Sequence, residues 1–263
     1  MSDRVIVVGD VHGCLGEFQA LVMDKLGFQP GDRVILLGDL MDKGPKPLEC
    51  LRWAQEQGFG AVASNHEAYH AVRYRRRQAF IEKGRPDNSK PWPHPEDEET
   101  NRLLTEEDVR WIESLPPWTT IVPGWVAVHG GFNPNLPLEQ QDPEKVRNMR
   151  YVDEAGKNVP IDYSTPGGPK KPAGTIHWAD RWQGPDSVIY GHEAFSLSNP
   201  RVTGKAVANR IVQTVGIDTG CVHGGRLTAL EFVTLRAGTH YHYKVEQVPS
   251  RQIYAQPLAP IPS

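Results

Sequence analysis

Cysteine, net charge and long apolar runs are all scarce in this 263-residue sequence, and each shortage excludes a class of protein. The three cysteines, Cys14, Cys50 and Cys221, are an odd number without metal-type spacing, which favours a reduced, cytoplasmic protein over a disulfide scaffold. The formal net charge of −3 argues against a general binder of polyanions, because such proteins usually carry a basic excess.

Apolar runs of membrane-spanning length are also missing. The apolar start of the chain is too short for a secretory signal and is interrupted by Asp10, and the uncharged stretch 114–138 is broken by prolines and glycines. A membrane helix needs roughly 20 consecutive apolar residues, so neither segment qualifies. We therefore expect a soluble protein with no membrane partner and no targeting segment.

Short apolar runs rich in Val and Ile are present instead, and they predict buried strands. Hydrophobic residues make up 38% of the chain, enough for a globular core, and 25 glycines with 23 prolines predict many ordered loops. Helical patterns over Leu15–Leu26 and Pro47–Gln57 separate the first three runs and end at Gly27 and Gly58. Residues 1–70 therefore predict a β-α-β-α-β unit with a largely parallel sheet. The predicted strands are Val5–Val8, Val34–Leu37, Ala61–Ala63, Trp125–Val128, Ser187–Tyr190 and Val212–Ile217.

A single domain is expected over residues 1–248, because neither an internal repeat nor a sharp change in composition divides the chain. Residues 84–105 are rich in proline and acid and are predicted to form an exposed insertion, and residues 164–174 a mobile surface loop. The stretch Arg226–Val248 alternates enough to predict antiparallel strands. The proline-rich tail, residues 249–263, is predicted to pack loosely or not at all.

Polar residues directly follow five of the predicted strands, usually beside a small residue. In α/β sheets ligands bind beyond the carboxyl ends of the strands, so these side chains are expected to share one crevice. Single members could equally be helix caps, turn residues or buried histidines, but one shared site explains all of them together. The residues are Asp10 and His12, Asp39 and Asp42, Asn65 and His66, His129, and His192.

This donor set predicts a catalytic metal site. Carboxylates, an amide oxygen and imidazoles, with no thiolate, suit Mn²⁺, Fe, Zn²⁺ or Co²⁺. The candidate ligands outnumber what one ion needs, and with Asp39 shared they suit two divalent ions about 3.5–4 Å apart. We expect manganese first, with iron, zinc or cobalt as alternatives.

Five motifs, in this order, resemble those of the calcineurin-like metallophosphoesterase superfamily. They are GDVHG (9–13), GDLMDKG (38–44), NHE (65–67), VHGG (128–131) and YGHE (190–193). The set is most similar to the phosphoprotein-phosphatase branch and its bacterial relatives. Two further segments resemble the diadenosine tetraphosphatase (ApaH-like) relatives, namely KGP (43–45) and IDTGCVHGGRLTAL (217–230). The resemblance implies an α/β fold in which a two-sheet β-sandwich is flanked by helices, in αββα layers.

The resemblance also implies a ligand set for two ions. The first ion would be held by two carboxylates and an imidazole, and the second by the shared carboxylate, an amide oxygen and two imidazoles. These are Asp10, His12 and Asp39 for the first ion, and Asp39, Asn65, His129 and His192 for the second.

The remaining roles follow in the same way. His66 resembles the general acid and Asp42 the carboxylate that orients it, while Arg150, Lys43 and Asn65 are expected to contact the substrate phosphate. Lys43 stands where protein phosphatases use Arg, so the planar two-point grip on phosphate is lost. A Ser also replaces the Gly that usually precedes NHE, which predicts a tighter or slightly displaced turn.

The implied activity is that of a dinuclear-metal-dependent phosphatase, which hydrolyses phosphate esters by direct attack of metal-bound hydroxide and resembles serine/threonine protein phosphatases. Three alternatives stay open: a dinucleoside polyphosphate hydrolase, a polynucleotide-end phosphatase and a non-catalytic phosphate-binding scaffold. The partner is accordingly a phosphoprotein or a nucleotide polyphosphate. The polynucleotide alternative is suggested by four arginines that could equally form a solvated helix face, namely Arg73, Arg75, Arg76 and Arg77.

Overall fold

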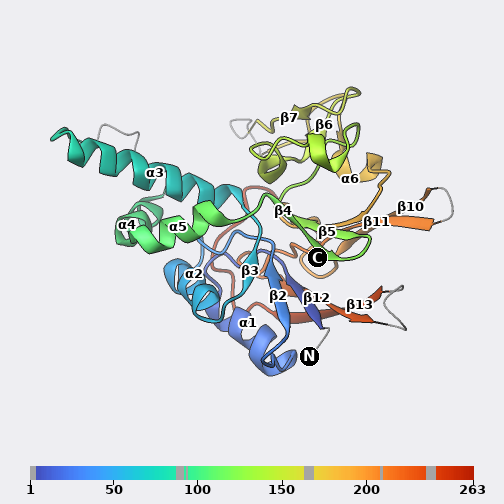
Figure 1. Cartoon of the computed structure of the whole chain (residues 1–263), viewed down its shortest axis with the longest axis horizontal. Coiled ribbons are helices and arrows are strands. Elements are labelled where there is room, and N and C mark those ends of the chain that lie inside the picture. The colour runs from blue at the N-terminus through green and yellow to red at the C-terminus, as the bar shows by residue number, and fades with distance from the viewer. Residues whose placement is uncertain (1–3, 87–91, 93, 163–168, 208–209, 235–240) are drawn as a thin grey trace.

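Two five-stranded sheets form the centre of the computed structural model, which describes residues 4–86, 92, 94–162, 169–207, 210–234 and 241–263 (Figure 1). The first sheet has the order β13-β12-β1-β2-β3, and the second β10-β11-β9-β5-β4. The first contains β1 (Val5–Val8), β2 (Arg33–Leu36), β3 (Gly60–Ala61), β12 (Arg226–Thr234) and β13 (Tyr241–Pro249). The second contains β4 (Trp118–Val122), β5 (Trp125–Val128), β9 (Ser187–Tyr190), β10 (Arg201–Val207) and β11 (Arg210–Gly216).

Strand β1 shows why the central runs are apolar throughout. Alternate residues of a strand face opposite sides of the sheet. Val5 and Val7 join the core between the two sheets, whereas Ile6 and Val8 join the core between the first sheet and the helices. Both faces of the strand are therefore buried, so the sequence cannot alternate with polar residues.

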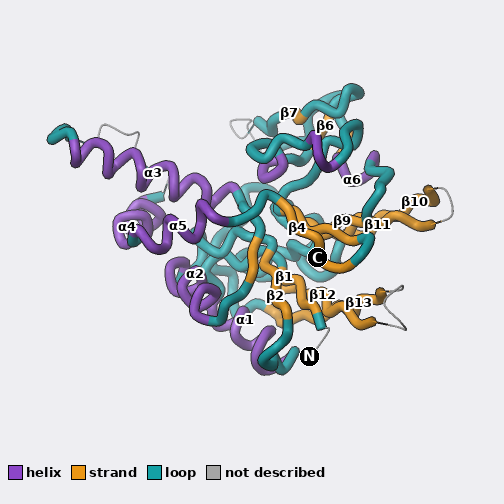
Figure 2. Tube along the Cα trace, viewed as in Figure 1, coloured by secondary structure: helices purple, strands orange, loops and turns teal. Residues whose placement is uncertain are grey.

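Helices cover the outer face of the first sheet (Figures 1 and 2). Gly27 and Gly58 follow the first two helical segments with φ of +59° and +67°, the left-handed conformation that ends helices. The helical segments are α1 (Leu15–Gln19), a π-helical turn η1 (Ala20–Lys25), α2 (Pro47–Glu56), α3 (Asn65–Glu82), α4 (Pro95–Leu103) and α5 (Glu106–Ser114).

A small lobe covers the second sheet and consists mostly of loops (Figure 2). Its core is aromatic. Trp178 and Trp182 pack around Phe132, which follows β5, and Trp178 also packs on Tyr190 at the end of β9. The lobe contains η2 (Leu138–Gln140), η3 (Val146–Asn148), β6 (Tyr151–Val152), β7 (Asn158–Val159), β8 (Ile176–His177) and α6 (Trp178–Arg181).

The predicted fold class is confirmed, since two mixed sheets pack face to face with helices outside. Strands β1, β2 and β3 are parallel, as the β-α-β-α-β pattern predicts. The antiparallel strands predicted over Arg226–Val248 are β12 and β13. All three cysteines are buried and free. In the described part of the chain, no helix is both long and apolar enough to cross a bilayer.

The prediction of an exposed insertion over residues 84–105 is wrong for its second half. That half forms α4, whose inner face buries Asp97 and Asn101, and Trp92 is only 8% exposed. The composition misleads because the buried face of α4 is itself polar, consisting of Asp97, Thr100 and Asn101. The predicted mobile loop 164–174 lies partly outside the described residues, and its described part, 169–174, has neither helix nor strand.

The tail 249–263 is attached to the rest of the domain at several points, although all of its residues are half-buried or exposed. The hydroxyl of Tyr254 donates to Glu17 at 2.9 Å, and the carbonyl of Pro262 accepts a hydrogen bond from the Leu197 N–H at 2.7 Å. Proline lacks only the N–H group, so its carbonyl still anchors the chain. Tyr254 and Ala255 also pack against the main core.

Candidate active site

The predicted polar residues gather where the loops after β1, β2, β5 and β9 meet the start of α3. An unbroken series of contacts, each 3.8 Å or shorter, links all ten predicted site residues. We call five of the members that follow strand ends the strand-end cluster; four of them are buried and His192 is half-buried. Its members are Asp10, His12, Asp39, His129 and His192.

The backbone around this site adopts an unusual conformation. In the described ranges, every non-glycine residue with a positive φ is one of the predicted site residues. Such left-handed conformations are unfavourable for residues with a Cβ and concentrate at functional sites. The residues and their φ values are His12 (45°), Asp39 (47°), Asp42 (68°), Lys43 (65°) and His192 (71°).

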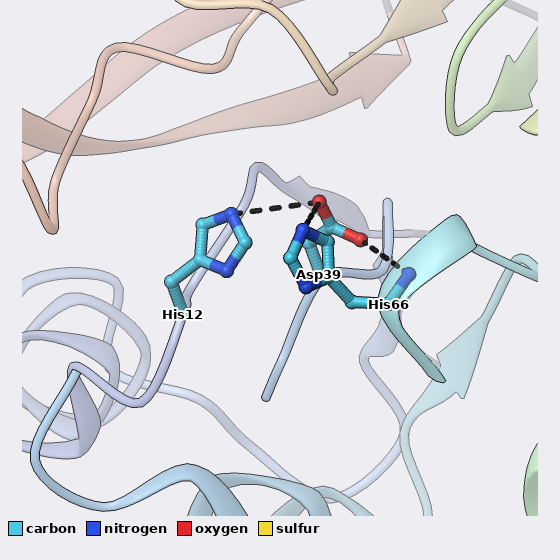
Figure 3. A group of neighbouring side chains, drawn as sticks. All are labelled: His12, Asp39 and His66. Carbon is cyan, nitrogen blue, oxygen red and sulfur yellow. Dashed lines mark hydrogen bonds and ion pairs between the residues drawn. The ribbon is translucent and has the colours of Figure 1, made fainter. Parts of the chain in front are cut away.

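One group of side chains surrounds the Oδ2 atom of Asp39 and is drawn in Figure 3. Asp39 Oδ2 lies 3.4 Å from His12 Nε2 and 3.8 Å from His66 Nε2. The carbonyl of Met41 lies 2.9 Å from His12 Nδ1, and a carbonyl can only accept, so the proton of the neutral ring is on Nδ1. Burial, and then the Lys43 ammonium, lower the pKa of His12, which leaves Nε2 unprotonated with its electron pair toward the site.

A second group surrounds the other Asp39 oxygen. His129 Nδ1 donates to the Leu37 carbonyl at 2.8 Å, so His129 Nε2 is an acceptor. Within 3.3 Å of this nitrogen lie Asn65 Oδ1 (2.8 Å), His192 Nδ1 (3.1 Å) and Asp39 Oδ1 (3.3 Å). Burial lowers the pKa of both histidines, so the neutral rings are favoured. The two oxygens are acceptors, as is His129 Nε2, and acceptors this close repel one another unless a cation lies between them.

Asp10 adds a buried carboxylate oxygen without a donor. Its side chain is 4% exposed; Oδ2 accepts the His192 N–H at 2.9 Å, and Oδ1 has no hydrogen-bond partner among the described residues. Burial, and then Asp218 and Asp39, raise the pKa of Asp10. A nearby cation would stabilise its charged form. With the nitrogen and oxygen donors of both groups, this oxygen fits the coordination chemistry of two divalent ions that share Asp39.

His66 and Asp42 form a close pair beside the first group. Asp42 Oδ2 lies 2.6 Å from His66 Nδ1. Burial opposes protonation of His66, but Asp39 and the hydrogen bond to Asp42 outweigh it and raise the pKa of the imidazole. Burial likewise opposes ionisation of Asp42, but hydrogen bonds from His66 and His70 prevail and lower the pKa of this carboxyl. The imidazolium–carboxylate pair is thus the favoured state.

His70 and Asn101, which were not among the predicted site residues, support this pair from behind. His70 is fully buried, and its Nε2 lies 2.6 Å from the second oxygen of Asp42. The amide of Asn101 donates to His70 Nδ1 at 3.2 Å and to the His70 carbonyl at 2.8 Å. His70 Nδ1 is therefore the acceptor and Nε2 carries the proton given to Asp42. The available signal was the spacing of His66 and His70, because residues four apart lie on one helix face.

Glu67 was not among the predicted site residues either, and it shapes the loop after β2. Its carboxylate accepts the backbone N–H groups of Asp39, Leu40 and Met41 at 2.8–3.0 Å. Ser64 donates its hydroxyl to the same carboxylate. The φ of Ser64 is −115°, which any residue adopts, so the backbone at this position does not require a glycine.

Of the three predicted phosphate contacts, the two positively charged side chains lie at the edge of the site, and Asn65 lies in the second donor group. The Lys43 ammonium donates to His12 Nε2 at 2.8 Å, and an Arg150 N–H donates to the His192 carbonyl at 2.9 Å. Each cation therefore borders one of the two donor groups.

The arginine-rich face of α3 is used for packing within the chain. Arg75 pairs with Glu106 and Glu113 of α5 at 2.7 Å each, and Arg77 donates to Asn101 of α4 at 2.6 Å. The Arg73 guanidinium lies over the Trp92 ring, 5.0 Å from its centre. These contacts attach α4 and α5 to α3. Three of the four arginines thus have partners in other segments of the chain, whereas Arg76 is exposed, and the support for a polynucleotide contact is reduced accordingly.

Comparison with known proteins agrees with this geometry. A family model described as calcineurin-like phosphoesterase matches residues 3–224. The chain is 29% identical over 268 residues to the Bis(5'-nucleosyl)-tetraphosphatase PrpE [asymmetrical] of Halalkalibacterium halodurans, with 94% of each chain covered. It is 26% identical over 240 residues to the protein of the same name from Anoxybacillus flavithermus, with 86% and 89% covered.

Solved structures share the fold. One is described as that of a candidate diadenosine tetraphosphatase, with a TM-score of 0.65, 23% identity, and 94% of this chain and 93% of that one covered. Another is a serine/threonine phosphatase of Saccharomyces cerevisiae, with a TM-score of 0.50, 18% identity, and 92% and 79% covered. At these identities the likeness concerns the fold alone.

Proposed function

This chain belongs to the calcineurin-like phosphoesterase family, and from that premise we propose that it hydrolyses dinucleoside polyphosphates such as diadenosine tetraphosphate. Family membership makes it a hydrolase of phosphoesters or phosphoanhydrides. The finer proposal is supported by relatives named as asymmetrical tetraphosphatases, whose length the chain matches almost fully. They favour this alternative over the serine/threonine phosphatase that the motifs first suggested, as does Lys43 in place of Arg.

The observation that carries the proposal is the pair of donor groups that share Asp39 beside the His66–Asp42 pair. We assign Asp10, His12 and Asp39 to one divalent ion, and the remaining set to a second. When bound, such ions activate water and neutralise charge on the phosphoryl oxygens. The second set is Asp39, Asn65, His129 and His192.

His66 acts on the leaving group. A water oxygen bonds to phosphorus while the bond from phosphorus to the bridging oxygen breaks, and the bridging oxygen takes a proton or a hydrogen bond from His66 Nε2. Asp42 holds the ring by its Nδ1 and stabilises the charged form. Lys43 and Arg150 then contact non-bridging phosphate oxygens, where negative charge accumulates.

A substrate panel tests this proposal directly. The full chain with Mn²⁺ is given diadenosine tetraphosphate, a phosphoserine peptide and 5′-triphosphorylated RNA, and products are separated by ion-exchange chromatography. We expect AMP and ATP from the first, with the highest kcat/KM. Preference for the peptide would restore the protein-phosphatase interpretation. Preference for RNA would favour a polynucleotide-end phosphatase. If no substrate is turned over, the chain is a non-catalytic phosphate-binding scaffold.

A further inference from the structure

A cavity of about 500 Å³ opens beside His66, where the first turns of α3 approach the start of α4 and the segment 144–148. We call it the lateral cavity. Of the proposed reacting and ion-binding residues that the structure describes, only Asn65, His66 and Asp42 line it. Its volume lies in the range of about 300–1,000 Å³ typical of small-molecule sites. The lateral cavity thus adjoins the proposed acid rather than the strand-end cluster.

That position determines which part of a substrate can occupy it. An acid delivers its proton to the departing oxygen, so a group bound beside His66 belongs to the leaving group. We infer that the lateral cavity binds the nucleoside of the leaving nucleotide, and that this leaving group is a nucleoside monophosphate. The inference rests on the proposed hydrolysis of dinucleoside polyphosphates.

Aromatic and apolar side chains on the cavity wall suit a nucleobase. Tyr69 and Val72 are 46% and 65% exposed although both are large apolar residues. The Tyr69 ring packs against buried Trp92 at 80°, with 4.8 Å between ring centres, and Arg73 lies over Trp92. Trp92 therefore holds an aromatic ring whose remaining surface faces solvent. Such anchored rings stack on bases of any sequence.

The charges that line the cavity favour an uncharged ligand over a polyphosphate chain. Three carboxyl groups lie there, Asp42, Asp97 and Glu144, and the one arginine among the described lining residues, Arg147, is paired with Glu144. Carboxylates repel phosphates but accept hydrogen bonds from ribose hydroxyls. A nucleoside offers those hydroxyls together with a flat base.

Spacing along α3 limits how much phosphate lies between the departing oxygen and the base. His66 and Tyr69 are three residues apart, which places their Cβ atoms about 5–6 Å from each other. One phosphate and a ribose suit that span better than a triphosphate. The water oxygen then bonds to the β-phosphorus, and the bond from this phosphorus to the α,β-bridging oxygen breaks. AMP departs with the bridging oxygen and its proton, and ATP is the other product.

Isotope labelling tests the identity of the leaving group. The full chain hydrolyses diadenosine tetraphosphate in H₂¹⁸O with Mn²⁺, and both products are analysed by mass spectrometry. We expect one ¹⁸O atom in the terminal phosphate of ATP and none in AMP. Label in AMP would mean that ATP departs, and would overturn the inference.

Substitutions on α3 test the cavity itself. Removing the ring in Tyr69→Ala should raise KM for diadenosine tetraphosphate about tenfold, equal to about 1.4 kcal/mol of binding. Tyr69→Phe keeps the ring and should keep KM. Because Tyr69→Ala also removes a contact of Trp92, Val72→Glu serves as a second variant that places charge in the cavity, with the same expected direction. For O-phosphoserine, whose leaving group has neither a base nor a ring, kcat/KM should stay within about twofold in all three.

The outcomes separate the two proposals. If the unchanged protein cleaves diadenosine tetraphosphate but Tyr69→Ala and Val72→Glu leave its KM unaltered, the nucleoside site is wrong and the proposed function stands. If the unchanged protein cleaves p-nitrophenyl phosphate but not diadenosine tetraphosphate, the proposed function fails and the nucleoside site fails with it.

Discussion

The two sides of this site are built in opposite ways. The strand-end cluster buries ionisable side chains, three of them on left-handed backbone, whereas the wall of the lateral cavity exposes apolar side chains on a regular helix. In the first region Asp10 is 4% exposed and has an oxygen without a donor. In the second, Val72 is 65% exposed on an ordinary helical turn.

This contrast indicates that the strand-end cluster carries out the reaction, whereas the helix wall of the lateral cavity selects the substrate. Buried acceptors and strained backbone destabilise a fold, so they persist where fixed charges and low dielectric strengthen electrostatic interactions with a reacting group. An exposed helix face carries no such cost and can change without disturbing the core. We therefore expect substitutions in the strand-end cluster to affect every substrate, and those on the helix wall to affect only substrates that reach it.

Asp39 gives the strongest test, because it belongs to both donor groups. Asp39→Asn keeps the size but removes the shared negative charge, so kcat should fall at least about 10²-fold. The loss should be similar for p-nitrophenyl phosphate and diadenosine tetraphosphate, measured with Mn²⁺, and bound manganese measured by elemental analysis should fall. A loss confined to one substrate would contradict the division proposed above.

His66 lies where the two regions meet, so its effect should depend on the leaving group. His66→Ala should lower kcat about 10²-fold or more for an alkyl ester such as phosphoserine, whose alkoxide needs a proton. For diadenosine tetraphosphate the loss should be smaller, because a leaving phosphate with a second pKa near 6 departs readily. p-Nitrophenyl phosphate should also lose little. Equal losses across the three would exclude the acid role.

His70 tests whether the helix side also positions reacting groups. His70→Leu removes the N–H that Asp42 accepts at 2.6 Å, and should lower kcat about tenfold with little change in KM. His70→Gln offers an amide N–H near the same place and should recover most of the rate. If both variants lose kcat equally, or KM alone changes, His70 only fills space.

The strand-end cluster could be predicted from sequence because its rule is local. A buried run followed by Asp, Asn or His fixes both the strand and the direction of the side chain, so Asp10 and His192 could be placed together although they are 182 residues apart. The helix side follows no such rule. Asn101 meets His70 only because α4 packs on α3 through Arg77, a contact that composition did not reveal.

Asp97, on the helix side, offers the smallest effect. Burial, and then the neighbouring Asp42, raise the pKa of Asp97 to about 7, whereas an unfolded Asp titrates near 3.9. The folded state therefore holds this proton more tightly, and stability that is fully present below about pH 4 is lost as the pH rises through 7. Asp97→Asn should raise Tm at pH 8 by about 2–4 °C, or about 1 kcal/mol after allowing for solvent screening, and change it little at pH 5. Glu99→Gln, at an exposed position of the same helix, is the control and should show no such pH dependence in thermal melts. An equal shift for Asp97→Asn at both pH values would show that this carboxyl is not strained by its neighbours.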